Sequence, residues 1–208
     1  MSLRTISSAG RGLLILALVG SLGAACSATS SIDPNDTTST GDVSRVTLCD
    51  SLSEMSDDSD LIVVGTVSTQ EVVRDITEED DFTVSSFNVT RVVKGADAKA
   101  GDVVEVRQIG SVDQQTGVEI LNADQVYLLY LTPSGLSGDL ASQYYVTGTE
   151  AGIYEATSGR SSNPSVLKST SQADSEKADK VSFGRVELDT GDTLPATATL
   201  PEAEEQAQ

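Results

Sequence analysis

Hydrophobic positions after residue 60 fall into short runs and alternations typical of strands. Residues 61–67 form a compact run rich in β-branched side chains, and residues 103–107 and 125–131 are similar. Such residues pack well on a pleated surface, so each run predicts a strand, and the first of them a buried one. Residues 82–93 alternate over a longer stretch, which predicts a long strand bent near its middle.

Weaker patterns complete the expected set of elements. Residues 71–74 continue the first strand across a kink or bulge, and shorter strands are predicted over 117–121, 144–146 and 152–154. One short helix is expected before them, because Leu48, Leu52 and Met55 fall on one helical stripe. Strands at this spacing, joined by Gly and Asp turns, predict an all-β domain over residues 45–155.

The strongest strands supply the predicted core. We expect five side chains to be largely buried, with Leu48 or Leu52 plugging one end of the domain. These five are Ile62, Val64, Val106, Leu129 and Leu131.

The apolar run near the N-terminus has the layout of an export signal. Arg4 and Arg11 precede residues 13–19, which are apolar, and the small residues 23–25 lead to Cys26. A cysteine at this point resembles bacterial lipoprotein signals, which implies a diacylglyceryl thioether on Cys26 and a lipid-anchored, palmitate-labelled protein. Ordinary cleavage and a permanent membrane helix remain alternatives, although the run is shorter than the roughly 20 residues that a span needs.

The remaining chain divides by composition. We expect a signal peptide over 1–25, a flexible tether over 26–44, the barrel domain over 45–155, a Ser-rich extension over 156–188 with a candidate edge strand at 181–188, and a disordered acidic tail over 189–208. The tether and the tail hold few apolar groups, so burial would not offset the entropy lost on ordering them.

The net charge of the chain limits the classes of partner that it can bind. Removal of the signal leaves 11 basic and 32 acidic residues, a net charge of −21. Phosphate backbones and anionic headgroups repel such a chain, which argues against nucleic acid and leaves the lipid as the means of membrane attachment. We expect an exported monomer at the cell surface.

The sequence offers few residues suited to catalysis or cofactor binding. The sequence has no His, which removes the usual general base and zinc ligand, and it has no nucleophile motif, so we assign no catalytic residue and no cofactor. If Cys26 carries lipid, Cys49 has no partner for an internal disulfide, and we interpret Cys49 as a packing residue.

Two groups of side chains are candidates for binding. Five clustered acids could hold calcium, although a solvated hairpin tip is the alternative: Asp75, Glu78, Glu79, Asp80 and Asp81. Three amphipathic rings could contact a carbohydrate or peptide, although packing in the barrel is the alternative: Tyr127, Tyr144 and Tyr154.

The motif order resembles a known family. A cysteine, a short helix, residues 60–67, 87–95, 101–107 and 127–131 follow one another as in bacterial secreted domains related to the tissue-inhibitor-of-metalloproteinases and netrin module. The resemblance covers residues 47–132 and implies a small, five-stranded Greek-key barrel of the oligosaccharide/oligonucleotide-binding (OB) type. Cys49 resembles the inhibitory cysteine of the animal family by position, but this chain lacks that family's disulfides.

These observations favour a lipid-anchored, cell-surface module that binds a protein or carbohydrate ligand. An envelope enzyme or a protease-inhibitor-like protein that uses carboxylates or a metal is the alternative from another class. A passive structural lipoprotein is a third.

Overall fold

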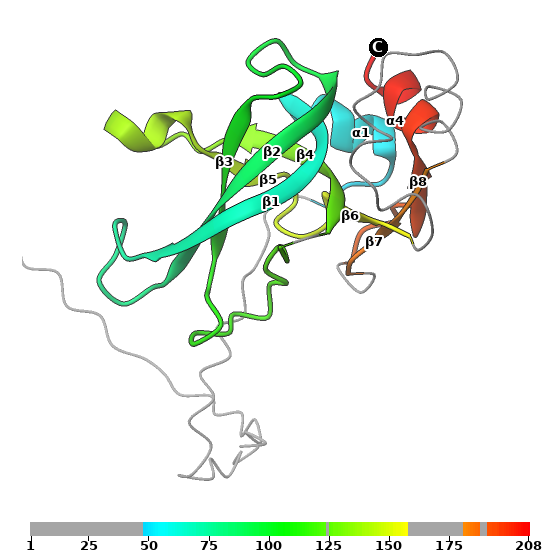
Figure 1. The fold of residues 1–208 in the computed structure, drawn as a ribbon. Helices are drawn as coiled ribbons and strands as arrows, with labels where there is room; N and C mark the ends of the chain where they lie inside the picture. Colours follow the sequence, from blue (N-terminus) through cyan, green and yellow to red (C-terminus); the bar gives the residue numbers. More distant parts are fainter. Residues whose placement is uncertain (1–47, 124, 158–180, 188–190) are drawn as a thin grey trace, which may run out of the picture. The chain divides into compact units, whose positions relative to one another are not determined.

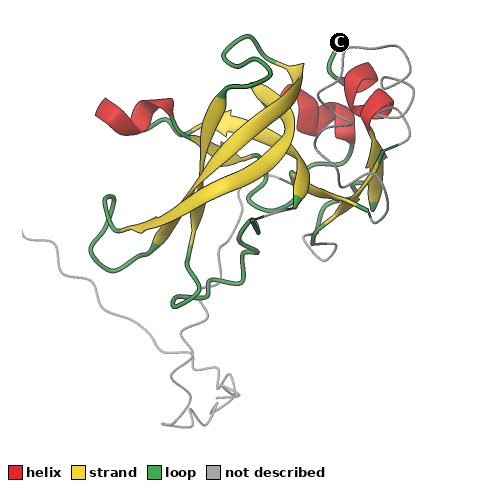
Figure 2. Ribbon diagram, in the orientation of Figure 1, coloured by secondary structure: helices red, strands yellow, loops and turns green. Residues whose placement is uncertain are grey.

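The computed structural model describes residues 48–123, 125–157, 181–187 and 191–208. All of them belong to one compact unit. Strands are the main regular structure of these residues. The α-helices lie near the two ends of the described chain, and the remaining helix in Figure 2 is the 3₁₀ helix Gly138–Ser142. The signal, Cys26, the tether and residues 158–180 lie outside the described residues.

The elements follow one another as α1 (Leu52–Asp57), β1 (Leu61–Val73), β2 (Phe82–Lys94), β3 (Val103–Ile109), β4 (Val126–Pro133), the 3₁₀ helix η1 (Gly138–Ser142), β5 (Tyr144–Val146), β6 (Ile153–Ala156), β7 (Ser182–Arg185), β8 (Thr197–Thr199) and α4 (Leu200–Gln206).

Five strands close into a barrel. β1 pairs antiparallel with β2 along one edge and with β4 along the other, and β2 pairs antiparallel with β3. β5 completes the circuit, parallel to β3 and antiparallel to β4. The resulting order, β1-β2-β3-β5-β4 and back to β1, confirms the predicted all-β class and the small OB-like Greek-key barrel (Figure 1).

The pairing of β1 with β2 is irregular in the first half of β1. Its register with β2 shifts at three points between Ile62 and Thr69, and such irregularities add local twist. Gly65 lies within this stretch, where an added Cβ would lie 2.1 Å from the Asn88 carbonyl oxygen and 2.6 Å from the Phe87 ring. Glycine is therefore the residue that lets β1 and β2 approach so closely.

Two hydrophobic clusters share the strands β1 and β4. The barrel interior holds the inner core: Leu61, Val63, Val67, Phe87, Val89, Val104, Val106, Leu121, Tyr127, Leu129, Leu131, Val146 and Ile153. Alternate residues of the same strands enter a second cluster, the outer core: Cys49, Met55, Ile62, Val64, Val126, Leu128, Tyr130, Ala151, Tyr154, Ala156, Val181, Phe183, Leu194, Ala198, Leu200 and Ala203. The five predicted core residues are all fully buried, but Ile62 and Val64 belong to the outer core and not to the barrel interior.

The C-terminal segment covers the outside of the barrel, so the predicted disordered tail is wrong for residues 191–208. Strands β6, β7 and β8 extend the sheet beyond β4, and α4 follows β8 directly (Figure 1). Leu200 and Ala203 on α4 pack into the outer core, and Arg91 of β2 forms an ion pair with Glu204. Four apolar side chains in this acidic segment are buried, Leu194, Ala198, Leu200 and Ala203, and the acidic composition of the segment did not reveal them.

Local signals set where α4 begins. The Thr199 hydroxyl accepts a hydrogen bond from the Glu202 backbone N–H, and the Glu202 carboxylate accepts one from the Thr199 backbone N–H at 2.7 Å. This capping box, followed by Pro201 in the first turn, is a sequence signature of a helix start.

β7 lies between β6 and β8, so the predicted edge strand is an interior strand of the sheet.

Two other local expectations are wrong. Residues 117–121 form an extended loop and not a strand, although Leu121 reaches the inner core. The helix α1 begins after the Ser51 cap, so Leu48 lies outside it and is half exposed. Leu52 packs against the outer core, which places α1 on the side of the barrel and not in its end.

Candidate functional site

Arg107 is a fully buried charged residue on the outer face of β3. Val104 and Val106 point into the inner core, and strand alternation therefore turns Glu105 and Arg107 outward. An outward side chain would ordinarily meet water, but the Arg107 side chain is 0% exposed because neighbouring loops cover it. A buried guanidinium requires partners for its charge and its donors.

Three groups satisfy the Arg107 guanidinium. Nη1 and Nη2 donate to the two carboxylate oxygens of Asp75, each at 2.7 Å, and Nε donates to Oε1 of Gln143 at 2.7 Å. The Phe82 ring lies against the guanidinium, with its centroid 5.3 Å from Cζ. The Gln143 side chain in turn donates from Nε2 to the Glu105 carboxylate at 3.0 Å.

This network joins two loops across β3. Asp75 belongs to the β1–β2 loop, residues 74–81, and Gln143 ends the β4–β5 loop, residues 134–143. The hydrogen bonds from Arg107 lower the pKa of Asp75, so this carboxylate stays ionised at any neutral pH. A bidentate ion pair with a buried arginine restricts the β1–β2 loop to one position.

The other end of the β1–β2 loop is held by a second set of contacts. Asp81 is buried and accepts hydrogen bonds from the Ser111 hydroxyl at 2.6 Å and from Arg74 Nε. These contacts, the Ser111 hydrogen bond foremost, lower the pKa of Asp81. The Asp81 backbone also bonds to the loop after β3, since its N–H donates to Gln114 and its carbonyl accepts from the Gly110 N–H.

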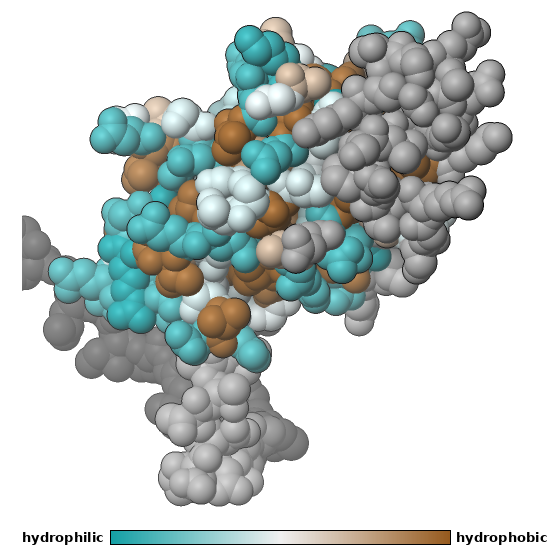
Figure 3. Space-filling model, viewed as in Figure 1, coloured by the Kyte–Doolittle hydropathy of each residue, from teal (hydrophilic) through white to brown (hydrophobic). Residues whose placement is uncertain are grey.

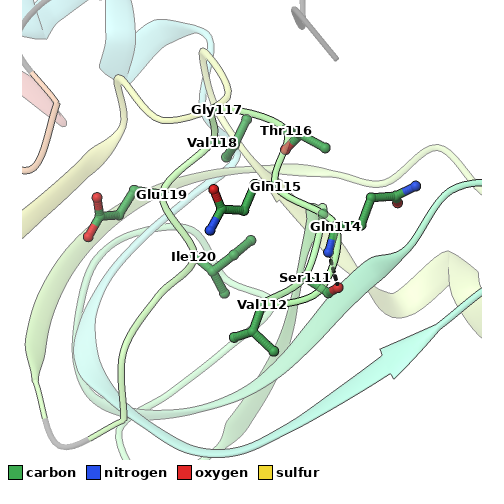
Figure 4. Close-up of a pocket in the computed structure, with 10 residues that line it drawn as sticks. Ser111, Val112, Gln114, Gln115, Thr116, Gly117, Val118, Glu119 and Ile120 are labelled. Carbon is green, nitrogen blue, oxygen red and sulfur yellow. Dashed lines mark hydrogen bonds between the residues drawn. The ribbon is translucent and has the colours of Figure 1, made fainter. Parts of the chain in front are cut away.

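A hollow of about 320 Å³ lies within the loop after β3, which runs over residues 110–120. In Figure 4, Gln115 and Ile120 face each other across it, and a hydrogen bond joins Ser111 to Gln114. Its lining carries a single ionisable side chain, Glu119. This composition suits weak polar contacts and offers no set of groups for acid–base or nucleophilic chemistry.

Beside these loops, β1, β2 and β3 present an uncovered outer surface, here named the open face. Cross-strand register places Thr69, Ser86 and Glu105 in one row and Glu71, Val84 and Arg107 in the next. Apart from Arg107, the side chains of these rows are exposed or half-buried. In OB-type barrels, this face and the β1–β2 and β4–β5 loops are where ligands bind.

The predicted aromatic contacts are mostly structural. Tyr127 lies in the inner core and Tyr154 in the outer core, where the Tyr154 ring packs at 6.0 Å from the Tyr130 ring. Burial raises the pKa of Tyr127, and it raises that of Tyr154 to about 12. Tyr144 is half-buried on β5, beside the inner core. Packing is therefore the role of at least Tyr127 and Tyr154.

The predicted calcium ligands point to different partners. Asp75 faces Arg107, Asp81 faces Arg74 and Ser111, and Asp80 bonds locally to Thr77. Glu78 and Glu79 are exposed. Among the described residues, no group of three or more His, Cys, Asp or Glu side chains is placed to hold a metal ion.

Sequence reasoning missed Arg107, which it treated as one more residue of the third strand. Nothing in the local pattern separates Arg107 from an exposed strand arginine, since its burial depends on Asp75 and Gln143, which lie 32 and 36 positions away. Cys49 is 2% exposed and lies in the outer core, as expected of a packing residue. Cys26 lies outside the described residues.

Fold and site together define an OB-type barrel with a strand-and-helix extension on one side and an open face on the other. The chain matches no known family model, and a comparison with curated protein sequences found no match either. Across the part of the chain that the structure describes, no helix is both long and apolar enough to cross a membrane.

Proposed function

We propose that this protein is a lipid-anchored, cell-surface module that binds a protein or carbohydrate ligand through the open face and its bordering loops. The observation that carries the proposal is the Arg107 network. It fixes the β1–β2 and β4–β5 loops beside an uncovered three-stranded surface. Loops fixed in advance lose little conformational entropy on binding, which favours recognition.

The asymmetry of the barrel supports the same conclusion. The outer core covers the barrel on the side of β1, β4 and β6, and the described C-terminal elements pack there. Three strand segments lie away from the outer core: the second half of β1, the first half of β2 and the whole of β3. Their outward side chains do not pack against it. A ligand therefore has access to one side of the barrel and not to the other.

The anchor is proposed from the sequence. Cys26 after small residues 23–25, followed by a polar segment up to residue 44, would hold the domain off a bilayer by a thioether-linked lipid. The net charge of −19 opposes docking on anionic lipid and on nucleic acid. We therefore propose export and lipid attachment, with no role for nucleic acid.

The family resemblance adds fold-level support and does not extend to inhibition. The barrel circuit has the OB-type order that the tissue-inhibitor and netrin resemblance implies. In that animal family, a terminal cysteine caps the protease metal, whereas Cys49 is buried in the outer core. No observation on the described residues favours the enzyme or inhibitor alternative.

Lipid attachment is tested by metabolic labelling with a palmitate analogue. The wild-type protein should be labelled and Cys26→Ala should not, because Cys26 is the cysteine that directly follows the proposed export signal. The control Cys49→Ala keeps Cys26 and should be labelled like the wild type. Equal labelling of wild type and Cys26→Ala would contradict the proposal.

Binding is tested by placing a large charged side chain on the open face. Ser86→Arg lies at its centre, and Ser53→Arg on the exposed side of α1 is the matched control. Both immobilised variants are exposed to solubilised native envelope and to an oligosaccharide array. We expect Ser86→Arg to lose a ligand that wild type and Ser53→Arg retain. Identical profiles for the two variants would place binding elsewhere.

A further inference from the structure

Exposed aliphatic side chains concentrate at one end of the barrel. Among the described residues, five large hydrophobic side chains are exposed: Leu48, Val72, Ile76, Val103 and Val112. Three of them, Val72 (51% exposed), Ile76 (41%) and Val112 (85%), belong to the end where β1 meets β2 and where β3 ends. Figure 3 shows hydrophobic side chains interspersed among hydrophilic ones over this part of the surface.

Hydrogen bonds join the chain segments that carry these three side chains. Val72 is paired with Thr83, whose hydroxyl donates to the Gly110 carbonyl at 2.7 Å, two residues before Val112. Gln114 Nε2 donates to the Glu79 carbonyl at 2.9 Å, which links the loop after β3 to the loop that carries Ile76. The end of β1 and the β1–β2 loop, which carry Val72 and Ile76, therefore lie against the loop that carries Val112.

The exposure of Val112 follows from its turn and not from a lack of structure. The Ser111 hydroxyl accepts hydrogen bonds from the backbone N–H groups of Asp113 and Gln114, and the Ser111 N–H donates to the Gln114 carbonyl at 2.9 Å. Asp81 holds the Ser111 hydroxyl from the other loop. Val112 is thus presented at the tip of a tight turn that is fastened to the barrel.

Acidic residues lie close to Ile76 and Val112 in the same two loops. Glu78, Glu79 and Asp113 are exposed and have no ion-pair partner among the described residues. The two arginines at this end are already neutralised, Arg74 by Asp81 and Arg107 by Asp75. The surface is therefore apolar at its centre and negative at its border, in a chain whose net charge is −19.

We propose that Val72, Ile76 and Val112, bordered by Glu78, Glu79 and Asp113, form a docking surface for a basic segment of a partner protein. The segment presents an aliphatic side chain flanked by Lys or Arg. This inference rests on the proposed binding function and names the chemistry of its ligand. A second copy of this chain, nucleic acid and anionic lipid are all repelled by the acidic border.

The test measures binding of short fluorescent peptides to the full chain by polarisation. The first peptide alternates Lys and Leu, the second replaces Leu by Ser, and the third replaces Lys by Glu. We expect the first to bind best, because only it offers both apolar contact and opposite charge.

Surface variants locate the binding. Val112→Ser and Ile76→Ser should each weaken the Lys–Leu peptide by about three- to tenfold, as expected for removal of an apolar contact. The double variant E78Q/E79Q should weaken it and reduce its dependence on salt. Leu48→Ser, an exposed aliphatic residue (49%) before α1 and away from the open face, and Asp97→Asn, in the β2–β3 turn, are matched controls and should bind within about twofold of the wild type.

Several outcomes would overturn the inference. Equal binding of the Lys–Ser and Lys–Leu peptides would reveal nonspecific charge attraction, and equal losses in the variants and the controls would place the contact elsewhere. If Ser86→Arg abolishes binding of an envelope ligand while Val112→Ser and Ile76→Ser leave it intact, this inference fails and the proposed function stands. If wild type binds neither envelope ligand, oligosaccharide nor peptide, both fail.

Discussion

At the scale of single residues, Arg107 shows how this barrel keeps its loops in place. It is the largest of the fully buried side chains in the described part of the chain, and its counter-ion lies on a loop. The Asp75 side chain remains 32% exposed, so water reaches one partner of the pair and not the other. Loss of the two partners should therefore have unequal consequences.

Asp75→Ala should destabilise the domain more than Arg107→Met. Removal of Asp75 leaves a buried positive charge, which we expect to cost about 2–3 kcal/mol, the range for hydrogen bonds to a charged group. Removal of Arg107 leaves a carboxylate that can turn to water. Denaturant melts of both variants measure the difference, with Glu78→Ala on the same loop as a control near wild type. Equal losses would show that water already reaches Arg107.

The carboxylates of Asp75 and Asp81 predict that the protein loses stability at acid pH. Contacts lower the pKa of Asp75 and of Asp81 below their unfolded values, so both groups bind more protons in the unfolded chain. Their contribution is complete above the unfolded pKa of about 4 and is lost as pH falls through the folded pKa. The free energy of unfolding, followed by denaturant melts between pH 7 and pH 2, should therefore decline below about pH 4.

Asp75→Asn serves as the control for this pH dependence. Its melting midpoint should lie below that of the wild type at pH 7, and the gap should narrow as the pH falls towards the lowered pKa of Asp75 in the folded protein, because the wild-type carboxylate then becomes protonated. A constant gap between the two proteins from pH 7 to pH 2 would mean that the Asp75 charge contributes nothing.

At the scale of elements, the barrel depends on a segment outside its five strands. β4 and the first half of β1, residues 61–67, are buried on both faces, and the faces that point away from the barrel interior are covered by β7, β8, α1 and α4. The start of the domain is tied to the same segment, because Asp192 accepts a hydrogen bond from the Cys49 N–H at 2.7 Å and Thr193 donates to the Asp50 carbonyl at 2.9 Å.

Truncation after residue 190 should therefore destabilise the whole domain. It removes Leu194, Ala198, Leu200 and Ala203 from the outer core and exposes the apolar faces of β1 and β4 to water. We expect a loss of several kcal/mol, comparable to one or two large-to-small core substitutions at about 2–5 kcal/mol each. Thermal melts of this variant, compared with a control that lacks only Gln208, provide the measurement. An unchanged midpoint would show that the segment does not stabilise the barrel.

At the scale of the whole molecule, negative charge is the dominant long-range force. A net charge of −19 opposes folding by self-repulsion, whereas the described residues contain three ion pairs that salt would weaken. Repulsion should prevail, because salt screens the partly buried Arg107–Asp75 pair much less than distant surface charges, and the other two ion pairs, which reach solvent, contribute at most about 1 kcal/mol each.

Added salt should consequently stabilise the protein. Raising ionic strength from about 0.01 M to 0.15 M shortens the screening length from about 30 Å to about 8 Å, which weakens repulsion between distant acids first. We expect the thermal midpoint to rise by a few degrees, with a smaller rise in a control variant that combines E78Q, E79Q and D97N. A fall in the midpoint with salt would show that the ion pairs outweigh the repulsion.

Local pattern by itself determined most strands of this protein. The runs at 61–67 and 103–107 lie within β1 and β3, and the run at 125–131 lies within β4 except for its first residue, because β-branched and aromatic residues favour a pleated, buried surface wherever that surface lies. The buried positions Val106 and Leu129 follow from the same alternation. A strand's own residues carry this information, so no partner had to be known.

Tertiary structure alone decided the rest, because it depends on contacts between distant residues. Pairing of β1 with β4 brings together residues about 65 positions apart, and this pairing closes the barrel. The burial of Arg107 depends on loops from both sides of β3, and order in residues 191–208 depends on a barrel surface built by β1 and β4. An acidic segment and a lone arginine look solvent-exposed in sequence, and only the surfaces they meet in the fold make them part of the core.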